Sequence, residues 1–279
     1  QSNYDEGLMM MGPPVSKNSM LSMPRENTPV VGLILGPGMI RTACHISFLK
    51  ALEEEGISIH IISGVGYGAV LAASYAAGFS SQKIEWNIFN FFHSDINYNP
   101  LSKKWDRYNK NYLEKIFNNL DIGDLKLSFV LPMYDANKKE VKFLKSGRVS
   151  SLTYKSSSLL NKADAIHLSA INEDFFQAKE YRNMGADVVI GIDVLGDDLT
   201  LLYGNDYLIG LFGRVISNIK AKNDDIDLFY TMPTSDMPLD STIGLASHLQ
   251  RCYNKSKLIT SELKIYLSDS QKKNQRLIQ

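Results

Sequence analysis

Two consecutive strand–glycine–helix units between Val30 and Gly78 constrain the fold of this chain more than any other feature. The first strand is a continuous apolar run, which is typical of a strand buried on both faces of a sheet. Each strand ends in a glycine turn, after which apolar residues recur at helical spacing. The predicted elements are a strand at 30–35, a helix at 41–55, a strand at 57–62 and a helix at 69–77. Parallel strands joined by crossover helices indicate an α/β fold with a mostly parallel central sheet and helices on both faces.

The second glycine turn has the spacing of the nucleophile elbow of serine hydrolases, Gly-x-Ser-x-Gly. In this chain the turn reads Gly64-Val65-Gly66-Tyr67-Gly68. The flanking glycines of an elbow permit its strained turn, and the amino terminus of the following helix faces the developing oxyanion. Both glycine turns fall at the carboxyl ends of strands, where sites in such sheets form. The central residue, Gly66, has no side chain and cannot act as a nucleophile.

The whole region resembles the amino-terminal half of a patatin-like phospholipase. In that family a glycine-rich oxyanion loop precedes a helix with an Ala-His-Ile-Gly-Val-Leu-Lys-Ala-Leu run, and a later strand ends in Gly-Thr-Ser-Ala-Gly. This chain has a similar run from Cys44 to Leu52, and Tyr75-Ala76-Ala77-Gly78 after the second turn. His45 matches a family histidine that we expect to be structural. The resemblance covers about 29–268, is weakest at 93–175, and implies a three-layer patatin-like fold.

The oxyanion loop of that family, Gly-Gly-Gly-x-Arg-Gly, is matched here at only two positions, Gly38 and Arg41. The first position is a proline, which has no N–H to donate. Side chains at the third and sixth positions restrict a loop that the family fills with glycine. We therefore expect a vestigial oxyanion loop. Its residues are Gly36, Pro37, Gly38, Met39 and Arg41, and Thr42 occupies the sixth position.

The second catalytic residue of the family is an aspartate at a set distance before a Met-Gly-Ala-Asp-Val-Val-Ile segment, which this chain has at 184–190. Counting back from that segment reaches Ser169. The nearest aspartates, Asp164 and Asp174, are not followed by glycine as the family's aspartate is. Gly66 and Ser169 thus stand at the two vestigial catalytic positions. Loss of a serine nucleophile typically lowers kcat by about six orders of magnitude, so the resemblance implies an inactive member.

Three functions are consistent with these residues. The first is a pseudohydrolase that binds a lipid or a protein partner in the cell envelope. The second is an active lipid acyl hydrolase or esterase with a displaced catalytic set. Tyr67 and Ser63 neighbour the empty position, and the helix dipole at the amino terminus would lower the phenol pKa of Tyr67. The third is a structural scaffold. An open apolar cleft ending at Gly66 favours ligand binding, and a filled one favours scaffolding.

Composition excludes several other classes. Lys plus Arg and Asp plus Glu both number 30, so the net charge is zero and no nucleic-acid partner is implied. No apolar run is long enough for a transmembrane helix. The five histidines lack metal-ligand spacing, and the run from Gly36 to Arg41 only half-matches a dinucleotide fingerprint, so we expect no metal or cofactor. Cys44 and Cys252 are too few for a disulfide framework, and we expect Cys44 to be a buried thiol.

We divide the chain into a flexible tether at 1–28, a patatin-like domain at 29–268 and a polar tail at 269–279 that we expect to fray. The sequence begins at Gln1 without an initiator methionine. A bacterial lipoprotein whose acylated cysteine lay just upstream would begin in this way. We therefore expect membrane attachment through a lipidated amino terminus, on the periplasmic face of the cell envelope. The alternative is a cytoplasmic protein whose chain is cut at this point, and the oligomeric state is left open.

The middle of the chain carries weaker patterns. The stretch 93–110 is polar and aromatic, and we expect a solvated loop; its cations, Lys103, Lys104, Arg107 and Lys110, alternatively suggest a membrane-surface or polyanion patch. The serine-rich stretch 150–160 lacks the loop that lines the family's cleft, so we expect a site that is shallower or differently closed. The other predicted elements are helices at 80–92, 111–120, 207–220 and 247–266, a hairpin of strands at 125–134 and 140–144, and strands at 187–194 and 227–231.

Overall fold

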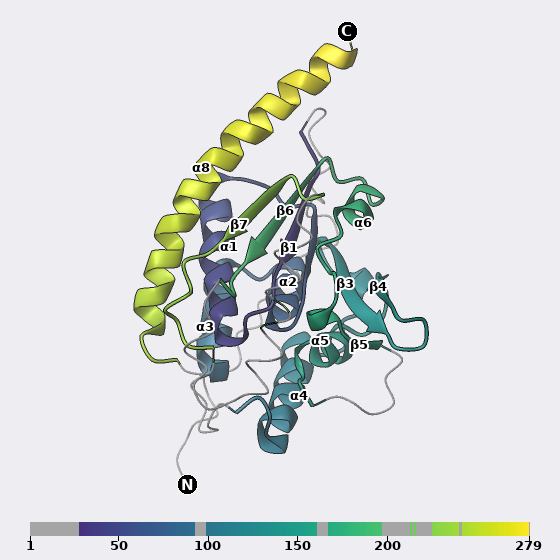
Figure 1. The fold of residues 1–279 in the computed structure, drawn as a ribbon, viewed down its shortest axis with the longest axis vertical. Coiled ribbons are helices and arrows are strands. Elements are labelled where there is room, and N and C mark those ends of the chain that lie inside the picture. The colour runs from purple at the N-terminus through teal and green to yellow at the C-terminus, as the bar shows by residue number, and fades with distance from the viewer. Residues whose placement is uncertain are drawn as a thin grey trace.

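The computed structural model describes residues 28–92, 99–160, 167–196, 213, 215, 225–239 and 242–278 (Figure 1). In this part of the chain one sheet has the strand order β4-β3-β2-β1-β6-β7, and β5 also pairs with β3. The strands are β1 Val31–Leu35, β2 Ile61–Gly64, β3 Ser128–Asp135, β4 Glu140–Leu144, β5 His167–Ser169, β6 Val188–Asp193 and β7 Leu228–Thr231. Only the pairs of β3 with β4 and β5 are antiparallel, which confirms the predicted mostly parallel sheet.

Helices surround this sheet, and β1 lies at its centre beside β2 and β6. The α-helices are α1 Cys44–Glu55, α2 Tyr67–Ala76, α3 Ser81–Phe92, α4 Lys103–Phe117, α5 Val149–Ser157, α6 Ala178–Arg182 and α8 Leu245–Ile278. Short 3-10 turns occur at η1 Met39–Ala43, η2 Ile122–Asp124 and η3 Ala170–Asn172. In Figure 1, α8 runs beside α1 and α3, α6 lies toward the other face of the sheet, and α4 and α5 lie near one end.

Alternate residues of the central strand pack into two separate hydrophobic cores. Val31, Leu33 and Leu35 belong to the core that also contains residues of α1, α2, α3 and α8. Ile34 belongs to the second core, together with Tyr181 of α6. Because successive side chains of a strand point to opposite faces, this division buries β1 from both sides. The apolar run of the sequence is continuous because β1 is buried on both faces of the sheet, as expected.

Two of the expected boundaries differ from those in the structure. The expected helix at 41–55 is divided into η1 and α1, and the expected strand at 57–62 joins the ladder only at Ile61. Gly56 ends α1 in the left-handed conformation with φ 66°. Residue His60 still contacts β1, because its amide donates to the Val31 carbonyl at 3.0 Å and its Nδ1 accepts the Val31 amide at 3.1 Å. Residues 57–60 thus lead the chain into the sheet.

The expected solvated loop at 93–110 is wrong for its second half, where α4 begins at Lys103. Ser102 caps this helix by accepting the Trp105 amide at 3.1 Å. The buried residues of α4 are spaced four apart, at Trp105, Asn109, Leu113 and Phe117. A capping serine followed by apolar residues at this spacing is a helix signal that the polar composition of the stretch concealed.

The serine-rich stretch forms helix α5, and α8 continues to Ile278 through the tail that we expected to fray. The hairpin prediction is confirmed, because β3 and β4 pair antiparallel. The predicted helix at 207–220 lies outside the described residues apart from positions 213 and 215, and so does nearly all of the tether at 1–28. Among the described residues, no helix combines the length and hydrophobicity needed to cross a membrane.

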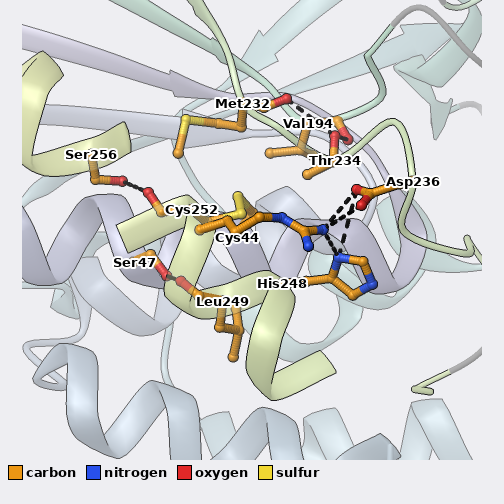
Figure 2. Close-up of a disulfide and its surroundings, with 11 residues drawn as sticks. Cys44, Ser47, Val194, Met232, Thr234, Asp236, His248, Leu249, Cys252 and Ser256 are labelled. Carbon is orange, nitrogen blue, oxygen red and sulfur yellow. Dashed lines mark hydrogen bonds and ion pairs between the residues drawn. A yellow bond between two sulfur atoms is a disulfide. The ribbon is translucent and has the colours of Figure 1, made fainter. Parts of the chain in front are cut away.

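Cys44 and Cys252 form a disulfide, so the expectation of a buried thiol at Cys44 is wrong. Figure 2 shows the bond joining α1 to α8, which lie side by side. The Ser47 hydroxyl of α1 also donates to the Leu249 carbonyl of α8 at 3.1 Å. Both cysteines are fully buried. The pairing could not be deduced from the sequence, because 208 residues separate the two cysteines and their contact depends on how the two helices pack.

Candidate functional site

The backbone of a nucleophile elbow is present at Gly66. Strand β2 ends at Gly64 and α2 begins at Tyr67. Gly66 lies between them with φ 61° and ψ −132°, a backbone conformation that residues other than glycine rarely adopt. A Cβ built on Gly66 would have its nearest contact with the Pro37 Cβ at 3.5 Å, an ordinary van der Waals distance. The elbow therefore has space for a side chain at its apex but carries none.

The glycines on either side of the apex are required by packing. A Cβ on Gly64 would lie 2.3 Å from the Gly68 carbonyl oxygen. A Cβ on Gly68 would lie 2.6 Å from the Gly36 and Leu35 carbonyl oxygens. These contacts are with backbone atoms, which cannot move aside as a flexible side chain can. The two glycines thus allow α2 to approach the ends of β1 and β2 closely.

The backbone amide at the apex is bound by Ser156 of α5. The Gly66 amide donates to the Ser156 hydroxyl oxygen at 3.0 Å. The Ser169 hydroxyl donates to the Ser156 carbonyl at 2.7 Å. The structure thus brings the two sequence-predicted vestigial positions, Gly66 and Ser169, to the same residue. Sequence reasoning did not identify Ser156, because nothing distinguishes it from the other serines between 150 and 158.

A cavity of only about 10 Å³ remains beside Gly66. This volume holds one water molecule at most. The residues that line it are Pro37, Gly38, Met39, Gly66, Tyr67, Pro100, Ser156, Ser157, Leu159 and Ile171. None of these ten is a carboxylate or a histidine, so the lining supplies no general base. The cleft is filled, which is the outcome that favours scaffolding over ligand binding in the interior.

The loop at the position of the family's oxyanion loop binds its own chain. The Ile40 amide donates to the Leu239 carbonyl at 3.3 Å, and the Arg41 amide donates to the Gly38 carbonyl at 2.8 Å. Met39 has a φ of 50°, so this non-glycine residue adopts the left-handed conformation. Such a conformation costs roughly 1–2 kcal/mol for a residue with a Cβ. The loop thus retains a glycine-like bend while two of its amides are already bound.

The Arg41 side chain is fully buried and binds backbone carbonyls. Its Nε donates to the Met237 carbonyl at 2.6 Å, and its terminal nitrogens donate to the carbonyls of Leu195 and Ser235. Arg41 is absent from the lining of the Gly66 cavity. Its position in the structure therefore gives it a structural role, which is to hold the 195 and 235–237 segments against η1.

Tyr67 does not have the properties of a displaced nucleophile. Its side chain is buried, and its hydroxyl oxygen accepts the indole N–H of Trp105 at 3.1 Å. Burial raises the pKa of Tyr67 well above its ordinary value, although the Trp105 hydrogen bond opposes this shift. The alternative of a displaced nucleophile at Tyr67 required a lowered pKa, and desolvation of the phenolate raises it instead.

His45 has the structural role that the resemblance implied. It is fully buried on α1, and its Nε2 donates to the Gly36 carbonyl at 2.8 Å, which fixes the turn after β1. Its Nδ1 has no hydrogen-bond partner among the described residues. Burial lowers the pKa of His45 to about 4, and the Gly36 hydrogen bond only partly offsets this effect.

We expect the free energy of unfolding to fall as the pH is lowered from about 6.5 toward about 4. In this range unfolded His45 binds a proton while folded His45 remains neutral. The stabilisation is complete above the unfolded pKa and is lost as the pH falls through the folded one, by up to about 3 kcal/mol. Denaturant unfolding of the wild type and His45→Gln across this range measures it. If the free energy of unfolding had the same slope against pH in the wild type and the variant, the expectation would be contradicted. Burial also lowers the pKa values of His60 and His248, and these two residues account for any slope that the two proteins share.

The described residues contain no group of three or more His, Cys, Asp or Glu side chains that could hold a metal ion. Asp193, at the end of β6, is buried and accepts the Leu195 amide at 2.9 Å and the Gly196 amide at 3.3 Å. Asp174 lies two residues after η3 and is half-buried, and Asp164 lies outside the described residues. Among the described residues, neither Asp174 nor Asp193 lines the cavity beside Gly66.

Comparison with known proteins identifies a family that matches the sequence and a solved structure with a similar fold. The patatin-like phospholipase family model matches residues 33–183, more than half of the chain. Lysophospholipase NTE1 of Coccidioides immitis is 30% identical over 202 residues, which cover 66% of this chain and 13% of that protein. The nte1 lysophospholipase of Aspergillus fumigatus is 27% identical over 192 residues, covering 63% of this chain and again 13% of the relative.

Among solved structures, VipD from Legionella pneumophila is similar in fold, with a TM-score of 0.51 at 12% identity. That similarity covers 88% of this chain and 67% of VipD. The chain spans a small part of the two fungal relatives, so their activity as whole proteins does not transfer directly to it. The region matched by the family model nevertheless includes most of β1, the elbow and the segment through α6. By the family model and by its fold, the chain belongs to the patatin-like phospholipase family.

Proposed function

We propose that this protein is a catalytically inactive patatin-like protein that acts by binding rather than by hydrolysis. The observation that carries the proposal is the apex of the elbow, where Gly66 has no side chain and its amide is bound to Ser156. The small volume of the adjacent cavity supports it further. A filled cleft favours contacts made by the surface of the protein, either with lipid or with a protein partner.

The alternative, an acyl hydrolase with a displaced catalytic set, has one candidate pair. The hydroxyl of Ser158 donates to the Asp106 carboxylate, which also accepts the Tyr154 hydroxyl at 2.6 Å. A serine paired with an aspartate is the combination that the family uses. However, Ser158 follows the carboxyl terminus of α5, where the helix dipole disfavours an oxyanion. Its hydroxyl also accepts the Leu160 amide at 3.2 Å, as in a local turn. We assign this pair to the packing of α4 on α5.

Gly66→Ser alone is expected to leave hydrolysis of a chromogenic short-chain ester at the background rate. The new hydroxyl would have no base, since a serine stands at position 169, and the φ of 61° would cost roughly 1–3 kcal/mol of stability. Wild-type turnover is expected to lie about a million-fold below that of an active family member. Steady-state ester hydrolysis by the wild type, Gly66→Ser, Ser169→Asp and the double variant measures these rates.

Two results of this assay would be decisive. Wild-type turnover within about a hundredfold of an active relative, abolished by Ser158→Ala or Asp106→Asn, would overturn the proposal in favour of the displaced pair. Turnover by Gly66→Ser alone would show that a base is present after all. Hydrolysis by the double variant, with neither single variant active, would support inactivity of the native chain and locate the lost base at position 169.

We place the protein in an oxidising compartment, such as the periplasmic side of a cell envelope. The support is the buried disulfide between Cys44 and Cys252, since such bonds persist in oxidising compartments and are rare in the cytosol. Attachment through a lipidated amino terminus stays a separate prediction. Cell fractionation of the full-length protein, with gel mobility compared with and without reductant, tests the placement. A reduced protein in the cytosolic fraction would refute it.

A further inference from the structure

Helix α4 presents a basic face to solvent. Its other face is buried, with Trp105 and Phe117 near its two ends. The exposed positions of α4 are Lys103, Lys104, Arg107, Lys110, Asn111, Glu114 and Lys115. Five of these are cationic and one is acidic, whereas the chain as a whole has a net charge of zero. The exposed side of α4 thus has a local excess of positive charge in a protein that is neutral overall.

This face contains an open pocket of about 360 Å³. The pocket is lined by Lys103, Lys104, Arg107, Tyr108 and Asn111, and we call these five residues the basic pocket. Tyr108 is half-buried, and its ring stacks on Phe91 of α3 with the centroids 5.4 Å apart. Its hydroxyl donates to the Phe91 carbonyl at 3.4 Å. The pocket therefore combines three cationic groups with an aromatic ring that is held in place.

No described carboxylate forms an ion pair with the cations of the basic pocket. Asp106 is the acid nearest to them in the sequence, but its carboxylate binds Tyr154 and Ser158 of the neighbouring α5 segment. The Asp106 carboxylate therefore joins α4 to the α5 segment and does not neutralise the cations of the pocket. The charges of the pocket thus remain available to an anion from outside.

The basic pocket is also fixed relative to the elbow. Trp105 donates its indole N–H to the hydroxyl oxygen of Tyr67, the residue after Gly66. The Asn109 side-chain amide donates to the Ser157 hydroxyl at 3.0 Å, and Ser157 lines the Gly66 cavity. One face of α4 therefore packs on the vestigial site while the opposite face carries the pocket. Binding at the pocket does not require the filled cleft to open.

We propose that the basic pocket docks this protein on a membrane surface that exposes anionic phospholipid headgroups. Ammonium and guanidinium groups bind phosphate oxygens strongly, and arginine does so through two parallel N–H bonds. The neighbouring helix α3 exposes 69% of Trp86, one residue before Asn87, whose carbonyl accepts the Tyr112 hydroxyl of α4. An exposed indole on the helix next to a basic pocket favours a lipid–water interface over a soluble anion. The five lining residues span about 12 Å of helix, a short footprint for a nucleic acid.

The test is sedimentation of the full protein, with its disulfide intact, in the presence of vesicles. Vesicles of phosphatidylcholine with about 30 mol % phosphatidylserine should bind it, and pure phosphatidylcholine vesicles should bind it far less. The variant Lys103→Gln/Lys104→Gln/Arg107→Gln should lose about fivefold in partition coefficient per charge, or on the order of 100-fold in total. A matched control, Lys145→Gln/Lys179→Gln/Lys255→Gln, removes three exposed lysines outside α4 and should change binding less than about threefold.

Several outcomes would overturn the proposal. Equal losses in the two triple variants would show that only net charge matters, and equal binding to neutral vesicles would show that the contact is apolar. Failure to bind anionic vesicles at low salt would exclude docking altogether. Inorganic phosphate should compete no better than sodium chloride of the same ionic strength; stronger competition would assign the pocket to a soluble phosphate ester. Because these positions are exposed, the thermal unfolding of both variants should match that of the wild type, whatever the result of the esterase assay.

Discussion

Replacing Cys44 or Cys252 by alanine is expected to lower the free energy of unfolding by about 2–5 kcal/mol. The disulfide closes a loop with a sequence separation of 208 residues, and the entropy that a cross-link removes from the unfolded chain grows with the length of the loop. Because either replacement breaks the same bond, the two single variants and the double variant should be destabilised to a similar extent. Equilibrium unfolding in denaturant, monitored by circular dichroism, measures the three differences.

Reduction of the wild type provides the matched control for these variants. When a reductant is present throughout unfolding, the wild type should lose its advantage over the double variant, and the variants should not respond to the reductant. Non-additive effects together with this response would assign the stabilisation to the bond rather than to the buried sulfur atoms. Alkylation of two free thiols in denatured, unreduced wild-type protein would show that the bond is absent.

Replacing Arg41 by methionine is expected to cost about 3 kcal/mol or more of stability. The buried guanidinium donates to the carbonyls of Leu195, Ser235 and Met237, and methionine fills similar space without supplying a donor. Each buried carbonyl that loses its partner contributes a desolvation penalty of roughly 1–3 kcal/mol. Arg41→Lys should recover only part of the loss, because an ammonium group is a point charge and lacks the planar fork of arginine. Thermal and denaturant unfolding of the wild type, Arg41→Lys and Arg41→Met measures their order of stability.

The control for this prediction is a second arginine near the same segment. Arg251 of α8 pairs with Asp236 at 2.6 Å, and their side chains are 45% and 65% exposed. Figure 2 shows Asp236 directed toward His248, beside the disulfide. Arg251→Met should cost less than about 1 kcal/mol, since exposed ion pairs contribute little. If Arg251→Met were as damaging as Arg41→Met, burial of the guanidinium would not be the cause.

The sequence predicted the central architecture because the two strand–turn–helix units are local. The apolar run of β1, the glycine turns and the face of α1 can each be recognised within a few turns of chain, and the sheet follows from them. The hairpin of β3 and β4 is local in the same sense. Helix α4 was only half predicted, because the polar residues before Asn111 concealed the cap at Ser102 and the spacing that follows it.

The site was predictable only in part, for a related reason. The empty apex at Gly66 can be read directly from a motif, and Ser169 from its spacing to a later segment. The contact that joins them passes through Ser156, which is 90 residues from Gly66 and has no distinguishing neighbours in the sequence. Burial raises the pKa of Tyr67, and its hydrogen bond with Trp105 is a contact between separate helices. The disulfide depends on the packing of two helices from opposite ends of the chain.

The close approach of α2 to the two central strands has a consequence for how such chains are recognised. Side chains at Gly64 and Gly68 would collide with the main chain, so these two residues are needed for folding whether or not a reaction takes place. A chain that had lost all turnover would still have to keep them to remain soluble and intact. Sequence searches that rely on the outer glycines will therefore group inactive and active family members together. The central residue of the turn, at position 66 in this chain, must be inspected separately.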